Sequence, residues 1–232
     1  MTLAENARIL RERVAAAAQR AARQPEDVRI IAVTKTVAVE ALRAAHALGF
    51  DTFGENRVQE AEEKITALRE LDLRWELIGH LQTNKAARAL QLFNRIQSLD
   101  SLRLAEVLNA RGRENSWVVP VLLEVNVSGE PSKTGFAPEA LREAARVVAD
   151  CGWLRAEGLM TVAPLASDPE AARPHLRRLR ELRDELAEHV PLAKGEWREL
   201  SMGMTDDFAV AIEEGATIIR IGRALFGERP PA

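Results

Sequence analysis

The amino-acid sequence predicts an α/β fold, a single (β/α)8 TIM-type barrel preceded by one extra helix. Eight short strand-like segments alternate with segments of helical periodicity, a pattern that produces right-handed crossovers and a parallel sheet. The length of 232 residues fits such a barrel, for which about 250 residues are typical. An open doubly wound sheet is the alternative, but no G-x-G-x-x-G follows the first strand, which weakens its dinucleotide-binding version. We therefore expect one domain over residues 1–232.

The first half of the chain contains four strand segments, each followed by a helical one. An amphipathic helix is expected before them, at 2–22, where apolar residues recur at helical spacing with arginines between them. Gly49 is placed to cap the next helix at its C-terminus, and Asp100 or Ser101 can cap the helix after the fourth strand. The expected strands are about 28–34, 50–54, 75–79 and 95–99, and the helices that follow them are about 38–48, 57–69, 83–90 and 102–111.

The second half continues the same alternation. The fifth strand segment is continuously apolar apart from Glu124 and Asn126. The seventh helix is heavily charged on its outer face, and the eighth has acidic residues in its first turn, where the helix dipole favours them. The expected strands are about 118–127, 154–160, 199–202 and 217–221, the helices about 138–149, 169–189 and 206–214, with a helical turn at 222–226 and a frayed tail at 229–232.

The composition indicates a globular chain of ordinary charge, with 47% hydrophobic residues, 29% charged residues and a formal net charge of −3. This near balance argues against a general attraction to nucleic acid or an anionic membrane. The single cysteine, Cys151, excludes an intramolecular disulfide and disfavours a cysteine-based zinc site, and no metal is expected. No apolar stretch approaches the ~20 residues that span a bilayer, and the charged N-terminus is unlike a signal peptide. We expect a cytoplasmic protein.

Lys35 ends the first strand segment, Arg29-Ile30-Ile31-Ala32-Val33-Thr34-Lys35. In a barrel of alternating strands and helices, the carboxyl ends of the strands carry the catalytic groups. An amine at such a position can attack a carbonyl and form a Schiff base. A surface lysine that merely ends a strand is the alternative interpretation.

Glycines occur in the loops after the seventh and eighth strands, the usual phosphate site of such barrels. These loops read Ser201-Met202-Gly203-Met204-Thr205 and Arg220-Ile221-Gly222-Arg223. Gly203 and Gly222 let backbone N–H groups approach an anion closely, and Ser201 and Thr205 offer hydroxyl donors. Gly222 also opens a short helix, whose N-terminus favours anions. Taken alone, either glycine can simply make a turn, but the two loops together favour a phosphate site.

A lysine amine and a phosphate cradle on one rim match pyridoxal 5′-phosphate (PLP), which carries an aldehyde at one end and a phosphate at the other. The sequence resembles the pyridoxal phosphate homeostasis proteins, the YggS/PROSC family. The matching segments follow the family's order at residues 32–35, 54–60, 75–85, 157–161, 200–207 and 219–227, and read AVTK, GENRVQE, WELIGHLQTNK, EGLMT, LSMGMTDD and IRIGRALFG.

The resemblance implies a barrel like the N-terminal domain of bacterial alanine racemases, with PLP held as an internal aldimine on Lys35. It places Asn56 beside the cofactor. Phosphate binding would fall to the Ser201 hydroxyl and to the backbone at Gly222 and Arg223, with Thr205 as a further hydroxyl donor. At position 223 the family more often has a small hydroxyl residue, so this arginine can instead pair ionically with the phosphate.

The resemblance also implies that Arg220 faces the pyridine nitrogen of PLP. An arginine is always charged and can only donate, so the nitrogen would stay unprotonated and the ring would be a poor electron sink. Racemases tolerate this arginine, so a second argument is needed. Racemization by the alanine racemase route uses a tyrosine from a partner's C-terminal domain, whereas this chain has no tyrosine and is too short for that domain.

The resemblance therefore favours a PLP-binding protein of intracellular PLP homeostasis that holds and releases PLP without conventional turnover. The alternatives are a racemase-like PLP enzyme acting on amino acids and a sugar-phosphate barrel enzyme using Lys35 as an aldolase-type amine. Apo PLP-dependent enzymes are the expected partners, without nucleic acid or membrane, and a monomer is expected. His80 as a proton shuttle and Lys133 as a second PLP site are weaker candidates.

Overall fold

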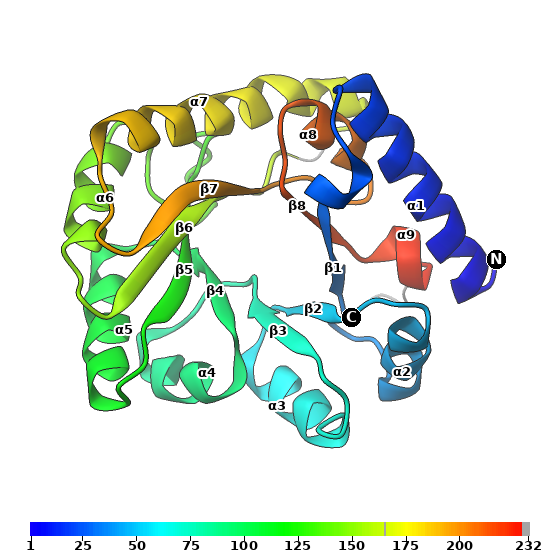
Figure 1. The fold of residues 1–232 in the computed structure, drawn as a ribbon, viewed down its shortest axis with the longest axis horizontal. Helices are drawn as coiled ribbons and strands as arrows, with labels where there is room; N and C mark the ends of the chain where they lie inside the picture. Colours follow the sequence, from blue (N-terminus) through cyan, green and yellow to red (C-terminus); the bar gives the residue numbers. More distant parts are fainter. Residues whose placement is uncertain (165, 229–232) are drawn as a thin grey trace.

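The computed structural model describes residues 1–164 and 166–228 and contains a closed barrel of eight strands. The strands follow one another around the barrel in sequence order, from β1 to β8. Each pairs in parallel with its neighbours, and β1 closes the ring against β8. Figure 1 shows the helices packed around this ring. The predicted (β/α)8 barrel is confirmed.

The elements alternate as the sequence predicts. The strands are β1 (Arg29–Val33), β2 (Thr52–Glu55), β3 (Arg74–Leu77), β4 (Arg95–Leu99), β5 (Val119–Glu124), β6 (Leu154–Met160), β7 (Gly195–Ser201) and β8 (Ile218–Ile221). The α-helices are α1 (Leu3–Arg20), α2 (Val39–Ala47), α3 (Val58–Ala67), α4 (Ala86–Leu92), α5 (Leu102–Glu114), α6 (Leu141–Ala149), α7 (Arg173–His189), α8 (Phe208–Glu213) and α9 (Arg223–Phe226). Short 3₁₀ turns are η1 (Pro25–Asp27), η2 (Thr83–Lys85) and η3 (Pro169–Ala172).

Several elements begin or end at other residues than the sequence pattern predicts. β7 begins at Gly195 rather than near residue 199, because its first half carries the exposed charges of Glu196 and Arg198 and lacks an apolar run. The helices predicted at 83–90 and 169–189 each begin with a 3₁₀ turn. β5 ends at Glu124, after which Val125 continues only as an isolated bridge to Phe136. The tail at 229–232 lies outside the described residues.

The extra N-terminal helix is present as α1, which lies beside α8 and α9 (Figure 1). Thr2 caps it, with the Thr2 hydroxyl accepting from the Glu5 N–H and the Glu5 carboxylate accepting from the Thr2 N–H. The Asn6 side-chain amide donates to the carbonyl of Leu225 at 3.0 Å. α1 therefore ties the start of the chain to its last helix.

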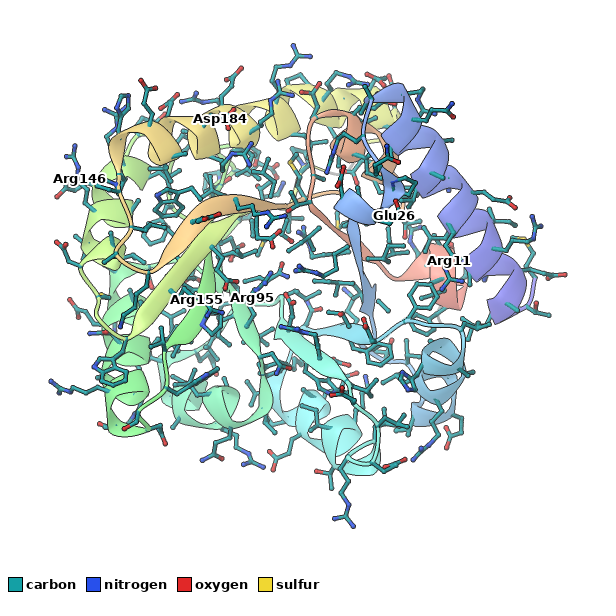
Figure 2. All side chains as sticks on the ribbon, viewed as in Figure 1. Arg11, Glu26, Arg95, Arg146, Arg155 and Asp184 are labelled. Carbon is teal, nitrogen blue, oxygen red and sulfur yellow. The ribbon has the colours of Figure 1, made fainter. Side chains whose placement is uncertain are left out.

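An ionic network closes the amino end of the barrel. Figure 2 shows Arg95 and Arg155 near the centre of the strand ring. The Arg95 Nε lies 2.9 Å from Glu157 Oε2, and the Arg155 Nε lies 2.7 Å from Glu157 Oε1. Arg95 also approaches Glu76 at 3.8 Å. In such barrels this end contributes stability while the opposite end carries function, so the site is expected at the carboxyl ends of the strands.

In the described part of the chain, none of the helices combines the length and the apolar character that crossing a membrane requires.

Candidate functional site

Lys35 occupies an exposed turn directly after β1. The N–H of Val37 donates to the carbonyl of Thr34 at 2.9 Å and closes this turn. Within it, Thr36 adopts a left-handed backbone with φ of 60°, a conformation that costs a non-glycine residue about 1 kcal/mol or more. Thr34, immediately before Lys35, is fully buried. Lys35 thus stands at the mouth of the barrel on a turn whose base is anchored in the core.

Asn56 follows β2 and lies next to the end of β3. At Gly79 an added Cβ would lie 2.5 Å from the Asn56 carbonyl oxygen, so only glycine permits this close approach. The side-chain oxygen of Asn56 is buried and accepts no hydrogen bond from the described residues. A buried acceptor without a donor costs free energy, and it would accept a hydrogen bond from a bound ligand.

Arg220 lies in β8 and points into the barrel. It is 4% exposed and donates to the Ser201 hydroxyl at 2.7 Å and to the Thr161 carbonyl at 2.6 Å. Burial lowers the pKa of Arg220 to about 10, against the opposing pull of the Asp207 and Glu124 carboxylates. At neutral pH the guanidinium therefore keeps its charge and acts only as a donor.

Ser201 joins this buried network. Its hydroxyl accepts from Arg220 and donates to the side-chain oxygen of Gln97 at 2.6 Å. The Gln97 amide in turn donates to Glu76 at 2.5 Å. In this arrangement Ser201 orients Arg220, and its predicted contact with a phosphate stays a prediction.

The two glycine loops predicted to bind phosphate lie side by side at the barrel mouth. The Arg220 N–H donates to the Gly203 carbonyl at 3.0 Å, and the Thr205 hydroxyl accepts from the Ala224 N–H at 3.2 Å. Gly222 immediately precedes α9. These contacts bring together the loop residues that the sequence singled out.

Arg223, at the start of α9, is exposed and pairs with acidic neighbours. Its guanidinium lies 2.5 Å from Asp206 and 3.7 Å from Glu228. An ionic contact with a phosphate would compete with these two carboxylates. The predicted phosphate contact of Arg223 stays a prediction.

His80 and Asp100 form a pair that sequence reasoning missed. The His80 Nδ1 lies 2.6 Å from Asp100 Oδ2. The residues follow β3 and β4, whose carboxyl ends meet at the same rim. Ser101 caps α5 through the Leu104 N–H, which leaves Asp100 available to His80. Sequence spacing could not pair them, because they lie 20 residues apart in different loops.

Buried acids surround this rim. Burial raises the pKa of Glu124, which accepts from the Thr134 hydroxyl at 2.8 Å. Burial likewise raises the pKa of Asp207, whose carboxylate accepts from the Met204 N–H at 2.6 Å. Across the described residues no group of three or more His, Cys, Asp or Glu side chains is arranged to hold a metal.

The chain matches the family model for the alanine racemase N-terminal domain over residues 6–230. Among curated proteins, it is 45% identical to the pyridoxal phosphate homeostasis protein of Aquifex aeolicus, with 94% of each chain covered. It is 42% identical to the protein of the same name from Pseudomonas aeruginosa, covering 98% of this chain and 96% of the relative.

Among solved structures, PipY of Synechococcus elongatus with PLP bound is 37% identical and has a TM-score of 0.85, covering 97% of this chain and all of the other. An alanine racemase of Clostridium difficile has a TM-score of 0.71 at 17% identity, covering 98% of this chain and 57% of the racemase. The racemase likeness shows the shared fold.

Proposed function

The chain belongs to the family of pyridoxal phosphate homeostasis proteins, and from this premise we propose that it binds PLP at the carboxyl end of its barrel. Lys35 holds the PLP aldehyde covalently in a Schiff base. The protein takes part in intracellular PLP homeostasis by binding and releasing PLP rather than by turning over a substrate. The PLP-bound PipY, which aligns over nearly the full chain, supports the binding of PLP.

One observation carries the proposal: the exposed Lys35 and an Asn56 oxygen that has no partner among the described residues follow neighbouring strands of one rim. β1 and β2 pair side by side, with Val33 opposite Gly54, so Lys35 and Asn56 lie just beyond paired positions. Because the Asn56 oxygen is buried and accepts no hydrogen bond from the described residues, a ligand at this rim would supply the missing donor. PLP carries an aldehyde that can react with the Lys35 amine and a ring hydroxyl that can donate to the Asn56 oxygen, so these two groups fit PLP.

The covalent step requires only reversible chemistry at Lys35. The neutral amine adds to the aldehyde carbon, and one water leaves as the carbon–nitrogen double bond forms. Addition of water, or of an incoming amine in place of water, reverses the attachment and releases the ligand. PLP supplies the electrophilic aldehyde when bound, while the chain positions the amine and keeps the ligand oriented.

The phosphate would be held by groups of the β7 and β8 loops: the Ser201 and Thr205 hydroxyls, the backbone at Gly222 and Arg223, and the Arg223 side chain. Arg220, charged and buried, would face the ring nitrogen as a donor and leave it unprotonated. This arrangement favours storage of the cofactor over carbanion chemistry. The Ser201 hydroxyl would keep Arg220 in place.

We further propose that the protein works in the cytoplasm as a monomer and passes PLP to apo PLP-dependent enzymes. Its homeostasis role would then rest on how tightly Lys35 retains PLP. Size-exclusion chromatography with light scattering tests the monomer directly, and a dimer would overturn that part.

Absorbance spectroscopy with chemical trapping tests the function. Purified protein mixed with PLP should develop a visible absorption band, and borohydride should then fix PLP to the peptide that contains Lys35. Lys35→Ala should lose the band and the modified peptide. Lys194→Ala is the matched control, because Lys194 is also exposed but precedes β7 at the amino end of the barrel.

Adding amino acids to the loaded protein separates carrier from enzyme. A carrier should release PLP or shift its spectrum without producing the opposite enantiomer or a keto acid. Sustained turnover would establish the racemase-like alternative. Protein that takes up no PLP would overturn the proposed function altogether.

A further inference from the structure

Three charged side chains from β2 and α3 form a compact group beneath the Lys35 turn. The Lys64 Nζ lies 2.6 Å from Glu55 Oε1 and 2.7 Å from Glu60 Oε1. The side chains of Lys64 and Glu55 are 8% and 0% exposed, and that of Glu60 is 27% exposed. We call Glu55, Glu60 and Lys64 the Lys64 cluster.

The Lys64 cluster binds the chain on both sides of Lys35. On the preceding side, the Lys64 ammonium donates to the Thr34 carbonyl at 2.5 Å, and the Thr34 hydroxyl donates to Glu55 at 2.6 Å. On the following side, the Thr36 N–H donates to Glu60 at 2.5 Å. Every member of the cluster therefore contacts a residue adjacent to Lys35.

Lys64 itself is occupied by these contacts. An ammonium has three N–H donors, and Lys64 has three acceptors: the Thr34 carbonyl, Glu55 and Glu60. A second role for Lys64 as a ligand-binding amine would break one of them. The cluster can therefore influence a ligand through the Lys35 turn rather than by touching it.

Holding these charges inside the protein is costly. Burial raises the pKa of Glu55, although hydrogen bonds from Lys64 and Thr34 oppose that rise. Replacing a buried ion pair with apolar residues is often neutral or stabilising, so stability alone does not explain the arrangement. The left-handed backbone of Thr36 adds a further free-energy cost. Such a strained conformation persists only where the surrounding contacts hold it in place. Both costs fall on the turn that presents Lys35.

We propose that the Lys64 cluster is the positioning device for Lys35, fixing the turn so that the amine meets the PLP aldehyde in a reactive orientation. This inference rests on the proposed function and adds to it three residues that set the rate of covalent attachment. Within the cluster, Glu60 holds the side of the turn that follows Lys35, because it accepts from the Thr36 N–H.

The decisive variant is Glu60→Ala, because Glu60 is the most exposed member and its loss should spare the fold. Glu60→Gln keeps an oxygen for the Thr36 N–H and serves as the conservative rescue. Glu63→Ala removes an exposed glutamate from the same helix and serves as the matched control. Each variant is compared with wild type for the rate of covalent PLP attachment and for hydrogen exchange at the Thr36 amide.

Glu60→Ala should slow covalent attachment by roughly tenfold, less than the roughly hundredfold cost of a 1 Å misplacement, because the contacts to Thr34 still hold one side of the turn. It should also accelerate Thr36 amide exchange by at least a similar factor. Glu60→Gln should restore most of both, and Glu63→Ala should match wild type. Pyridoxine 5′-phosphate, which has an alcohol in place of the aldehyde, should bind all four proteins equally. Unchanged attachment and exchange in Glu60→Ala would overturn the inference.

Lys64 needs a paired variant, since Lys64→Met alone would leave Glu55 buried without its cation and could prevent folding. Glu55→Gln combined with Lys64→Met removes the charge together with its partner. This folded double variant should also attach PLP slowly while binding pyridoxine 5′-phosphate normally, and normal attachment would contradict the inference. Wild-type protein that attaches no PLP would instead refute the proposed function, so the two failures are distinguishable.

Discussion

At the residue scale, a chain of buried hydrogen bonds runs through the barrel interior, with every donor pointing in the same direction along it. Arg220 donates to Ser201, Ser201 to Gln97, and Gln97 to Glu76. All four side chains are buried. The donor-only arginine stands at one end and the carboxylate acceptor at the other, so each group between them both accepts and donates. This chain fixes the orientation of Arg220 far more firmly than apolar packing would.

Glu124 is a residue-scale case in which burial and charge conflict. Burial raises its pKa, Thr134 lowers it through a hydrogen bond, Asp100 raises it, and Arg220 and His80 lower it. Between pH 4.5 and the raised value, the folded protein binds a proton that the unfolded chain has released. The free energy of unfolding therefore falls as pH rises through this window.

Glu124→Gln should remove that dependence. Glutamine stays neutral and its oxygen can still accept from Thr134, so the variant should unfold at higher denaturant concentration than wild type at pH 7. The gain should shrink as pH falls toward 4.5. Urea unfolding at several pH values measures it, with the exposed Glu139→Gln as control. A Glu124→Gln protein that is less stable at pH 7 would contradict the pKa direction.

At the element scale, β6 and β7 approach each other unusually closely at Gly158. Its φ is 151°, and a Cβ built there would lie 2.0 Å from the Glu199 carbonyl oxygen. The β6–β7 register shifts between Ala156 and Gly158. A glycine inside a predicted strand indicates a bulge or a close backbone approach, and here the structure shows both.

Gly158→Ala should therefore destabilise the protein by about 3 kcal/mol, the upper range for forcing atoms into packed structure. Two glycines at which an added Cβ would meet no atom within 4 Å serve as comparisons. Gly129→Ala, with φ of 69°, should cost about 1 kcal/mol from backbone strain alone. Gly152→Ala should stay within about 0.5 kcal/mol of wild type. Equal losses at Gly158 and Gly129 would show that the backbone contact is unimportant.

For the whole molecule, closure of the barrel connects the two halves of the chain. β1 pairs with β8, and α1 packs beside α8 and α9 outside that seam (Figure 1). Removing either half would expose unpaired strand edges and the apolar core shared between the strands and helices. This closure connects both halves of the described chain, and the single domain over residues 1–232 stays a prediction.

We expect a single unfolding transition in urea. Trp75 and Trp197 are buried on β3 and β7, on different parts of the ring, so tryptophan fluorescence reports on both halves. Fluorescence and far-ultraviolet circular dichroism should give coincident midpoints. Two separated transitions would indicate that the halves unfold independently, and a truncation at residue 150 should in that case retain a folded fragment.

The sequence placed the bounds of β4 and β6 where the structure has them, at Arg95–Leu99 and Leu154–Met160. β4 is buried along its whole length although it contains polar residues, because parallel strands in a barrel are covered inside and out. The predicted strand at 199–202 is shorter than β7, because the first half of β7 carries exposed charges at the amino end of the barrel. Lys35 and the two glycine loops were predicted to share a rim, which follows from parallel strands alone.

The sequence by itself determined the barrel, the family and the candidate amine, since these depend on local periodicity and on contiguous motifs. Only the tertiary structure decided that Lys64 is buried, because in the sequence it is one more charged residue of an amphipathic helix. The same holds for the pairing of His80 with Asp100 and for the inward-facing hydroxyl of Ser201. Each depends on how closely separate strands and helices approach, and that distance is set by packing across the whole barrel.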